Sequence, residues 1–143
     1  MIVKHILKLK GSTSIETIAP GALVAEAAAR LDKRRIGALV VSETGSDIAG
    51  ILSERDIVRA LARKGGGCLN MKVSELMTAE VESCAPGENA NSVLERMTQG
   101  RFRHMPVVED GRMIGLVSIG DVVKTRISEI EQENQAMANL LGG

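Results

Sequence analysis

The stretch Gly50-Ile51-Leu52-Ser53-Glu54-Arg55-Asp56 decides how this chain folds, because Gly115-Leu116-Val117-Ser118-Ile119-Gly120-Asp121 repeats its pattern 65 positions later. In both stretches an apolar run ends in Gly, two aliphatic residues and Ser, and apolar positions at helical spacing begin at once. Each stretch therefore predicts a strand that runs directly into a helix. The chain is interpreted as an internal duplication.

The predicted junction between strand and helix is suited to binding a phosphate group. The first backbone N–H groups of a helix have no partner inside it, and the helix dipole places positive charge there. Ser53 and Ser118 carry hydroxyls that can reach a phosphate oxygen, and Asp56 and Asp121 can accept from a ribose diol. The same Ser-x-x-Asp pattern also predicts a helix cap, in which the two side chains bond to backbone amides. Both interpretations stay open at this point.

The composition argues against a nucleic-acid partner. The chain has 143 residues, 44% of them hydrophobic, which is enough for one compact unit or for two small halves that share a core. Its 18 basic and 18 acidic residues balance, so no electrostatic footprint for DNA or RNA is present. With one Phe and no Trp or Tyr, stacking platforms are scarce, and any bound base is expected to lie among aliphatic side chains.

Cysteine usage and the start of the chain predict a soluble, cytoplasmic protein without membrane contact. Cys68 and Cys84 form no C-x-x-C pair, so reduced thiols are expected and a zinc site is not. Lysines interrupt the stretch 1–10 too often for a signal peptide, and no apolar run approaches the length of a membrane span.

Outward from the two motifs, the same order of elements, β-α-β-β-α, is predicted twice. The first copy has an extended or helical lead-in to Lys10, a turn at 11–14, strands at 15–18, 37–41 and 48–52, a hairpin loop at 43–47, and helices from Leu23 and from Glu54 to a flexible Gly65-Gly66-Gly67 stop. The second has a lead-in at 73–78, strands at 81–84, 105–108 and 113–117, a hairpin at 109–112, and a helix that buries Val93, Leu94 and Met97.

This order predicts one unit over residues 1–70, a second over 71–126 and a helical extension over 127–143. Neither half is expected to be stable alone at this size, so the two sheets are predicted to pack together.

Four segments resemble a tandem pair of CBS domains, also called a Bateman module: Arg35 to Val41, Gly50 to Arg59, Arg103 to Val108, and Gly115 to Asp121. The chain looks like a standalone CBS-domain protein of bacterial type. The resemblance implies a mixed α/β (α+β) fold, in which two CBS units pack as a pseudo-symmetric pair with a long C-terminal helix.

The resemblance also implies a function and a set of site residues. CBS pairs bind adenosine-containing ligands such as AMP, ADP, ATP, S-adenosylmethionine or NAD in two clefts, without a required cofactor, and pass the signal to a protein target, here unknown. Carried over by position, Asp56 and Asp121 would accept the ribose hydroxyls, and Ser53 and Ser118 would approach phosphate. Thr17 and Ser83 match a polar position on the first strand, and the start of the second strand, which meets adenine or phosphate, corresponds to Ile36, Gly37 and Ala38 and to Arg103, His104, Met105 and Pro106.

The two predicted sites differ in their cations. Arg55 precedes the first Asp and can fork onto a phosphate, whereas Gly120 stands at that place in the second copy. The second site could take its cation from Arg103 or His104. The alternatives are a solvated Arg55 and a neutral His104 at the start of a strand.

Sequence motifs for catalysis are weak, and the chain is predicted not to be an enzyme. Gly65-Gly66-Gly67 ends a helix instead of opening one, and no G-x-G-x-x-G follows a strand. Cys84 and His104 could form a nucleophile and its base, but a Cys inside an apolar strand is more often a small core residue. The competing function is a constitutive dimeric scaffold whose sites are vestigial.

The C-terminal tail carries a heptad pattern. Its apolar seam is spaced 4, 3, 4, 3 and 4 residues apart and comprises Val123, Ile127, Ile130, Asn134, Met137 and Leu141. The pattern predicts one helix from about Ile119 to about Leu141 that pairs with a second copy, with Asn134 fixing a parallel register. A homodimer is therefore expected, and the alternatives are packing along the chain's own body or docking of a partner.

Overall fold

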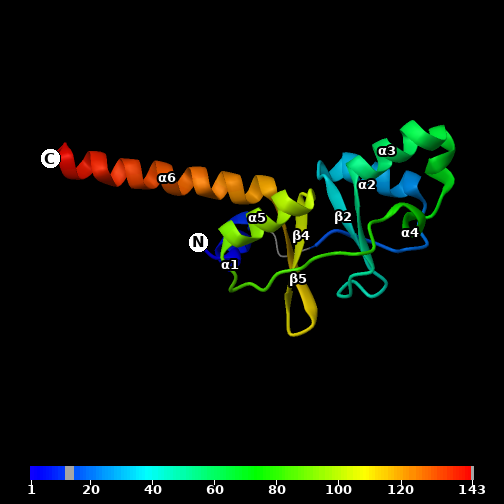
Figure 1. The fold of residues 1–143 in the computed structure, drawn as a ribbon, viewed down its shortest axis with the longest axis horizontal. Helices are drawn as coiled ribbons and strands as arrows, with labels where there is room; N and C mark the ends of the chain where they lie inside the picture. The colour runs from blue at the N-terminus through cyan, green and yellow to red at the C-terminus, as the bar shows by residue number, and fades with distance from the viewer. Residues whose placement is uncertain (12–14, 143) are drawn as a thin grey trace.

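The computed structural model describes residues 1–11 and 15–142 and confirms the mixed α/β fold with a duplicated unit and a long C-terminal helix (Figure 1). The elements in chain order are α1 (Val3–Lys10), β1 (Thr17–Ile18), α2 (Val24–Arg34), β2 (Ala38–Val41), β3 (Gly50–Ser53), α3 (Glu54–Lys64), the 3-10 helix η1 (Gly65–Asn70), α4 (Val73–Leu76), α5 (Ala90–Gly100), β4 (His104–Glu109), β5 (Arg112–Ser118) and α6 (Ile119–Leu141). The lead-in is thus helical. Of the turn expected at 11–14, Gly11 ends α1 with φ 69°, and residues 12–14 lie outside the described part.

Each half contains a small sheet whose last strand leads directly into a helix. In the first half the strand order is β1-β2-β3, with β1 parallel to β2 and β2 antiparallel to β3. In the second half β4 and β5 form an antiparallel hairpin with an irregularity between Val107 and Val108. Because β3 and β5 run straight into α3 and α6, both Ser-x-x-Asp motifs stand at the predicted junctions.

The strand predicted at 81–84 is wrong, since only Cys84 pairs there, in one parallel bridge with Val107. In the first half the N–H of Val40 donates to the carbonyl oxygen of Glu16 at 3.3 Å, which extends the pairing of β1 with β2. Pro106 stands at the position of Val40 and has no N–H to donate. The pairing in the second half is therefore shorter.

Each half has its own apolar core, so the predicted packing of the two sheets on one another gives way to two separate clusters. The first core is built mainly from α2, β2, β3 and α3, and it also takes in Val73 of α4. The second is built from α5, β4, β5 and α6, and it takes in Val3 and Ile6 of α1. The helix that begins the chain thus packs on the second half, and the helix that precedes the second repeat packs on the first.

The two lead-in helices dock through equivalent backbone hydrogen bonds. The N–H of Val3 donates to Glu88 O at 2.9 Å, and the N–H of Val73 donates to Ala22 O at 2.8 Å. The Ala22 and Glu88 positions are 66 apart, within one residue of the spacing between the two Ser-x-x-Asp motifs. Each lead-in helix therefore packs on the other half at an equivalent position, as the pseudo-symmetry of the two halves requires.

α3 is followed directly by a 3-10 helix, and α6 is long. α3 ends at Lys64 as predicted, but Gly65-Gly66-Gly67 is not a flexible stop, because these residues begin η1. α6 runs for 23 residues, or about 35 Å at 1.5 Å per residue, and buries only Val122 and Thr125. Its later turns project away from the rest of the chain (Figure 1).

Within the described residues, α6 included, no helix combines the length and apolar character needed to cross a bilayer.

Candidate functional site

A cavity of about 550 Å³ lies between the two halves, within the size range of ligand pockets. Three segments line it: the β2 start and the β3–α3 junction of the first half, the segment that leads into the second half, and the turn between α5 and β4. The lining residues are Gly37, Ile51, Ser53, Glu54, Arg55, Asp56, Arg59, Thr78, Glu80, Val81, Glu82, Gly100, Arg101, Phe102, Arg103 and His104. We call this cavity the first cleft.

The first wall of the cleft is the N-terminus of α3, where Ser53 and Asp56 form a capping box. Asp56 Oδ2 accepts hydrogen bonds from Ser53 N at 2.9 Å and from Ser53 Oγ at 3.0 Å, and Asp56 N donates to Ser53 Oγ at 3.3 Å. The capping interpretation is therefore confirmed. Among the described residues, Oδ1 of Asp56 accepts no hydrogen bond, so one carboxylate oxygen remains available at the cavity.

The second wall is the connecting segment, held against β3 by a two-way backbone bridge. Ile51 N donates to Thr78 O at 3.0 Å, and Thr78 N donates to Ile51 O at 2.9 Å. Farther along, Arg96 of α5 holds the carboxylate of Glu82 at 3.2 Å. The segment is thus fixed to both halves, one at each end.

The third wall is the turn after α5. Arg101 ends α5 in the left-handed region, with φ 57°, and its N–H bonds back to the last turn of the helix. The ring of Phe102 lies against Gly100 so closely that a Cβ there would overlap it. Phe102 is the only aromatic residue of the chain. The cleft therefore offers one aromatic ring beside its aliphatic side chains, where the sequence had predicted aliphatic side chains alone.

Four exposed arginines surround the cleft: Arg55, Arg59, Arg101 and Arg103. None of them forms an ion pair with another residue in the described part of the chain. The nearby acids are partly engaged, since Glu82 pairs with Arg96 and Asp56 caps α3. Several guanidinium groups are therefore available to an anion in the cleft.

His104 stands at the start of β4, opposite Ser118 of β5 and close to Gly37 of the first half. A Cβ built on Gly37 would lie 3.4 Å from His104 Cε1. Burial lowers the pKa of His104 and outweighs the opposing effect of Asp121. The imidazole is therefore neutral at pH 7, which supports the interpretation of a neutral strand-start histidine over a second phosphate cation.

Six of the fourteen residues predicted for the sites line the first cleft: Gly37, Ser53, Arg55, Asp56, Arg103 and His104. The others lie elsewhere for identifiable reasons. Ala38, Met105 and Pro106 are buried within strands, and Ile36 faces a separate groove between α2 and α3. Thr17 lies in β1, where its carbonyl oxygen accepts from Arg30, and exposed Ser83 accepts from Arg96 in the same way.

Ser118 and Asp121 form a second capping box at the start of α6, and a lysine also bonds to the capping oxygen of the carboxylate. Asp121 N donates to Ser118 Oγ at 3.0 Å, and Asp121 Oδ2 accepts from Ser118 N at 2.9 Å. The same Oδ2 accepts from Lys10 Nζ at 2.9 Å. Burial raises the pKa of Asp121, yet the hydrogen bonds from Lys10 and Ser118 and the charge of Lys10 hold it below its ordinary value.

Several lining residues were missed from the sequence, notably Thr78, Glu80, Arg59, Arg101 and Phe102. Arg59 follows Arg55 by one helical turn, so its place on the same face of α3 was predictable. Arg101 and Phe102 directly precede a predicted site segment. No pattern in the sequence marks Thr78 or Glu80 as a lining residue, because their place in the cleft depends on how the connecting segment pairs with β3.

Cys84 is a core thiol of the second half. It is buried, and burial together with the charge of Glu88 raises its pKa to about 11 against the opposing effect of Arg96. The thiol is therefore protonated at neutral pH, which disfavours the nucleophile considered for it.

Comparison with known proteins agrees with this geometry. A family model described as CBS domain matches residues 3–63 and again 73–128. The mitochondrial CBS domain-containing protein CBSX3 of Arabidopsis thaliana is 37% identical over 125 residues, which make up 84% of this chain and 61% of that protein. The chain therefore spans less than two thirds of that relative.

Two solved structures extend the comparison to the fold. The CBS-domain containing protein ATU1752 from Agrobacterium tumefaciens is 42% identical with a TM-score of 0.84, over 88% of this chain and 99% of that one. The CBS domain pair of protein MJ0100, solved in complex with 5-methylthioadenosine and S-adenosyl-L-methionine, is 27% identical with a TM-score of 0.79, over 90% and 98% of the two chains. The two matches to the family model cover most of the sequence, and this chain belongs to the CBS-domain family.

Proposed function

We propose that this chain is a regulatory module that binds a phosphorylated adenosine ligand in the first cleft and passes the binding event to a partner protein. The observation that carries the proposal is the cavity of about 550 Å³ between the halves, which combines a helix N-terminus, an available carboxylate oxygen and four arginines that form no ion pair with any described residue. The adenosyl ligands of MJ0100, a CBS pair of the same fold, support the choice of ligand class.

The proposed contacts follow from the chemistry of each wall. Asp56 Oδ1 would accept from the ribose hydroxyls while Oδ2 keeps its capping bonds. The arginines and the N–H groups at the start of α3 would hold phosphate. Adenine would lie in the less polar part of the cleft, near Ile51, Val81 and Phe102. Four arginines favour AMP, ADP, ATP or NAD over ligands that carry no phosphate.

A thermal-shift screen tests the proposal. A ligand that binds only the folded chain stabilises it by about 2.7 kcal/mol when present at about 100 times its Kd, which raises the melting temperature measurably. We expect AMP, ADP, ATP or NAD to raise the melting temperature of the wild type, and the same ligand at the same concentration to raise that of Asp56→Ala by a smaller amount. If no adenosyl ligand shifts the wild type, the sensing function is contradicted and the dimeric scaffold takes its place.

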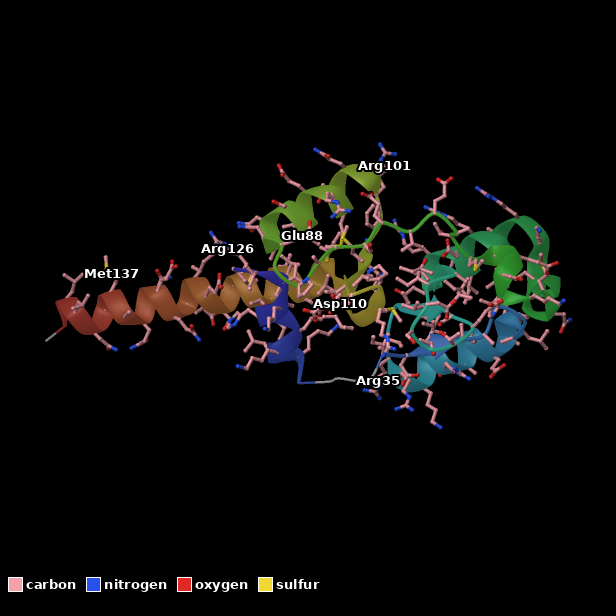
Figure 2. All side chains as sticks on the ribbon, turned by 90° about the horizontal axis from the view of Figure 1, so that it is seen from below. Arg35, Glu88, Arg101, Asp110, Arg126 and Met137 are labelled. Atoms are coloured by element: carbon pink, nitrogen blue, oxygen red, sulfur yellow. The ribbon has the colours of Figure 1, made fainter. Side chains whose placement is uncertain are left out.

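The homodimer is part of the same proposal, and α6 supports it. Large apolar side chains remain exposed along the helix, among them Val123, Ile127, Ile130 and Met137, at 43%, 52%, 43% and 59% of full exposure. Figure 2 shows Met137 on the part of α6 that has no other segment beside it. A second copy of α6 would cover this seam and pair the two Asn134 side chains. The seam is also the observation that favours the scaffold as a second candidate.

A further inference from the structure

The charged side chains that line the first cleft balance in number, because four acids stand beside its four arginines. These acids are Glu54, Asp56, Glu80 and Glu82. Glu54 and Glu80 form no ion pair with another described residue, and Asp56 takes part in the cap of α3. A phosphate in the cleft therefore meets attraction and repulsion together, and the state of the fourth acid, Glu82, affects which of the two dominates.

Arg96 of α5, which does not itself line the cavity, pairs with Glu82. Its Nε and Nη2 donate to Glu82 Oε1 at 3.3 and 3.2 Å, and Nη2 also donates to Ser83 O at 3.0 Å. Nη1 donates to Glu88 Oε1 at 3.4 Å, farther along the same segment. One guanidinium thus binds this segment at three points and pairs with a carboxylate that lines the cleft.

The first half pairs the equivalent acid with an arginine at a different position. Glu16 stands 66 positions before Glu82, and Arg34 Nε of α2 lies 3.2 Å from Glu16 Oε1. In the second half Gly100 stands at the position of Arg34 and offers no side chain. Arg96, one turn earlier on α5, supplies the cation instead. The two halves therefore share the pairing of this acid, although different helix positions provide it.

From these contacts we infer that Arg96 is a positioning residue that sets the preference of the first cleft for phosphorylated ligands. It pairs with Glu82, so that this carboxylate does not repel a phosphate held by the arginines of the cleft. The inference rests on the proposed function, since it takes phosphate as the group that those arginines bind. The side chains of Arg96 and Glu82 are exposed to 33% and 52%, so solvent screens the pair and the expected effect is moderate.

Calorimetric titration of the full chain with AMP and with adenosine tests the inference. In Arg96→Met we expect the Kd for AMP to rise about threefold to tenfold and the Kd for adenosine to change by less than about twofold, because adenosine carries no phosphate for Glu82 to repel. Adding Glu82→Gln to Arg96→Met removes the unpaired charge and should restore the Kd for AMP. Equal losses for the two ligands would show that Arg96 only supports the fold. That result, an unchanged Kd for AMP, or no restoration by Glu82→Gln would overturn the inference.

Arg30 of α2 is the matched control. It stands 66 positions before Arg96 and donates to Thr17 O at 2.6 Å, as Arg96 donates to Ser83 O, but neither Arg30 nor its partner Glu26 lines the first cleft. Arg30→Met removes the same charge and an equivalent contact to a backbone carbonyl, and it should leave the Kd for AMP unchanged. A rise as large as in Arg96→Met would assign the effect to the loss of any surface cation and would contradict the role of Arg96.

A second probe separates the inference from the proposed function. Tripolyphosphate carries phosphate groups without a nucleoside, so its binding tests the charge of the cleft without adenosine recognition. We expect it to bind the wild type and Arg30→Met equally and Arg96→Met more weakly. If no adenosyl ligand binds the wild type, the sensing function fails, and tripolyphosphate alone decides on Arg96. A higher Kd in Arg96→Met supports the inference, and equal or undetectable binding in all three proteins overturns it.

Discussion

Asp56 and Ser53 form reciprocal hydrogen bonds at the start of α3, and only one oxygen of the carboxylate takes part. Oδ2 accepts both the N–H and the hydroxyl of Ser53, at 2.9 and 3.0 Å. A helix cap and a ribose acceptor can therefore be the same residue, because the cap leaves the other oxygen to the cleft. The two functions can be separated by mutation.

Asp56→Ala should remove the cap of α3 and the ribose contact in the first cleft, whereas Asp121→Ala should remove the cap of α6 and leave the first cleft unchanged. Loss of a cap lowers the stability of the fold by about 0.5–2 kcal/mol in either variant. Affinity for AMP should fall at least about tenfold in Asp56→Ala, since charge-assisted hydrogen bonds are lost, and should stay unchanged in Asp121→Ala. Urea unfolding and calorimetry measure the two quantities. Equal affinities in both variants would leave Asp56 with capping alone.

Arg55→Ala should weaken the binding of AMP and not that of adenosine. The guanidinium contributes to phosphate binding, so removing it should raise the Kd for AMP by about tenfold. Arg63→Ala is the control, because Arg63 lies on the last turn of α3 and does not line the cleft. Titration of each variant with both ligands gives the answer. Unchanged AMP affinity in Arg55→Ala would show that this side chain serves only the solvent-exposed face of α3.

Gly100→Ala should disturb the cleft through Phe102. The added methyl group overlaps the aromatic ring, which must shift away from its contact with the second core. We expect a net loss of about 1–3 kcal/mol in stability, as for other overpacked sites, together with weaker ligand binding. Gly67→Ala has open space around its Cβ and should change neither quantity by more than about 1 kcal/mol. If Gly100→Ala changes neither the stability nor the ligand affinity, the Phe102 ring can move aside at no cost.

Stability should fall in mild acid because of His104. Burial holds the pKa of this imidazole below 6.5 in the folded state, so the unfolded chain takes up a proton first as the pH drops. The contribution of neutral His104 is complete above about pH 6.5 and decreases toward the lower folded-state pKa. Urea unfolding between pH 7.5 and 5 should show this slope in the wild type, and a shallower one in His104→Gln. Identical slopes would assign the dependence to other groups.

Truncation after Arg126 should weaken dimerisation while leaving the first cleft intact. The deletion removes the apolar seam from Ile127 onward and keeps every residue that lines the cavity. Sedimentation should show a lower association constant for the truncated chain, with AMP affinity unchanged. A dimer as tight as that of the full chain would place the contact on the CBS helices and leave α6 for a different partner.

Periodicity and local motifs were enough to predict most of the fold. The junctions at Ser53 and Ser118, the helices α2, α3 and α5, and the extent of α6 follow from patterns within single segments. The strand at 81–84 failed because Pro106, which sits in a different segment, removes the N–H that such a strand would need. The effect of Pro106 on residues 81–84 could be recognised only once β4 was known to be their pairing partner.

Features that depend on contacts between distant segments could not be predicted. The exchange of lead-in helices brings Lys10 to Asp121, 111 positions away, and no local pattern signals that contact. The place of Thr78 in the first cleft likewise depends on its pairing with Ile51. The sequence showed two equivalent motifs, and the two positions differ because the chain that surrounds them differs.

The most direct test of the account is a crystal structure of the full chain grown with AMP. We predict a nucleotide in the first cleft, with its ribose on Asp56 Oδ1 and its phosphate among Arg55, Arg59, Arg101 and Arg103. A nucleotide bound only outside this cavity, or an empty cleft at AMP concentrations far above those in cells, would contradict it.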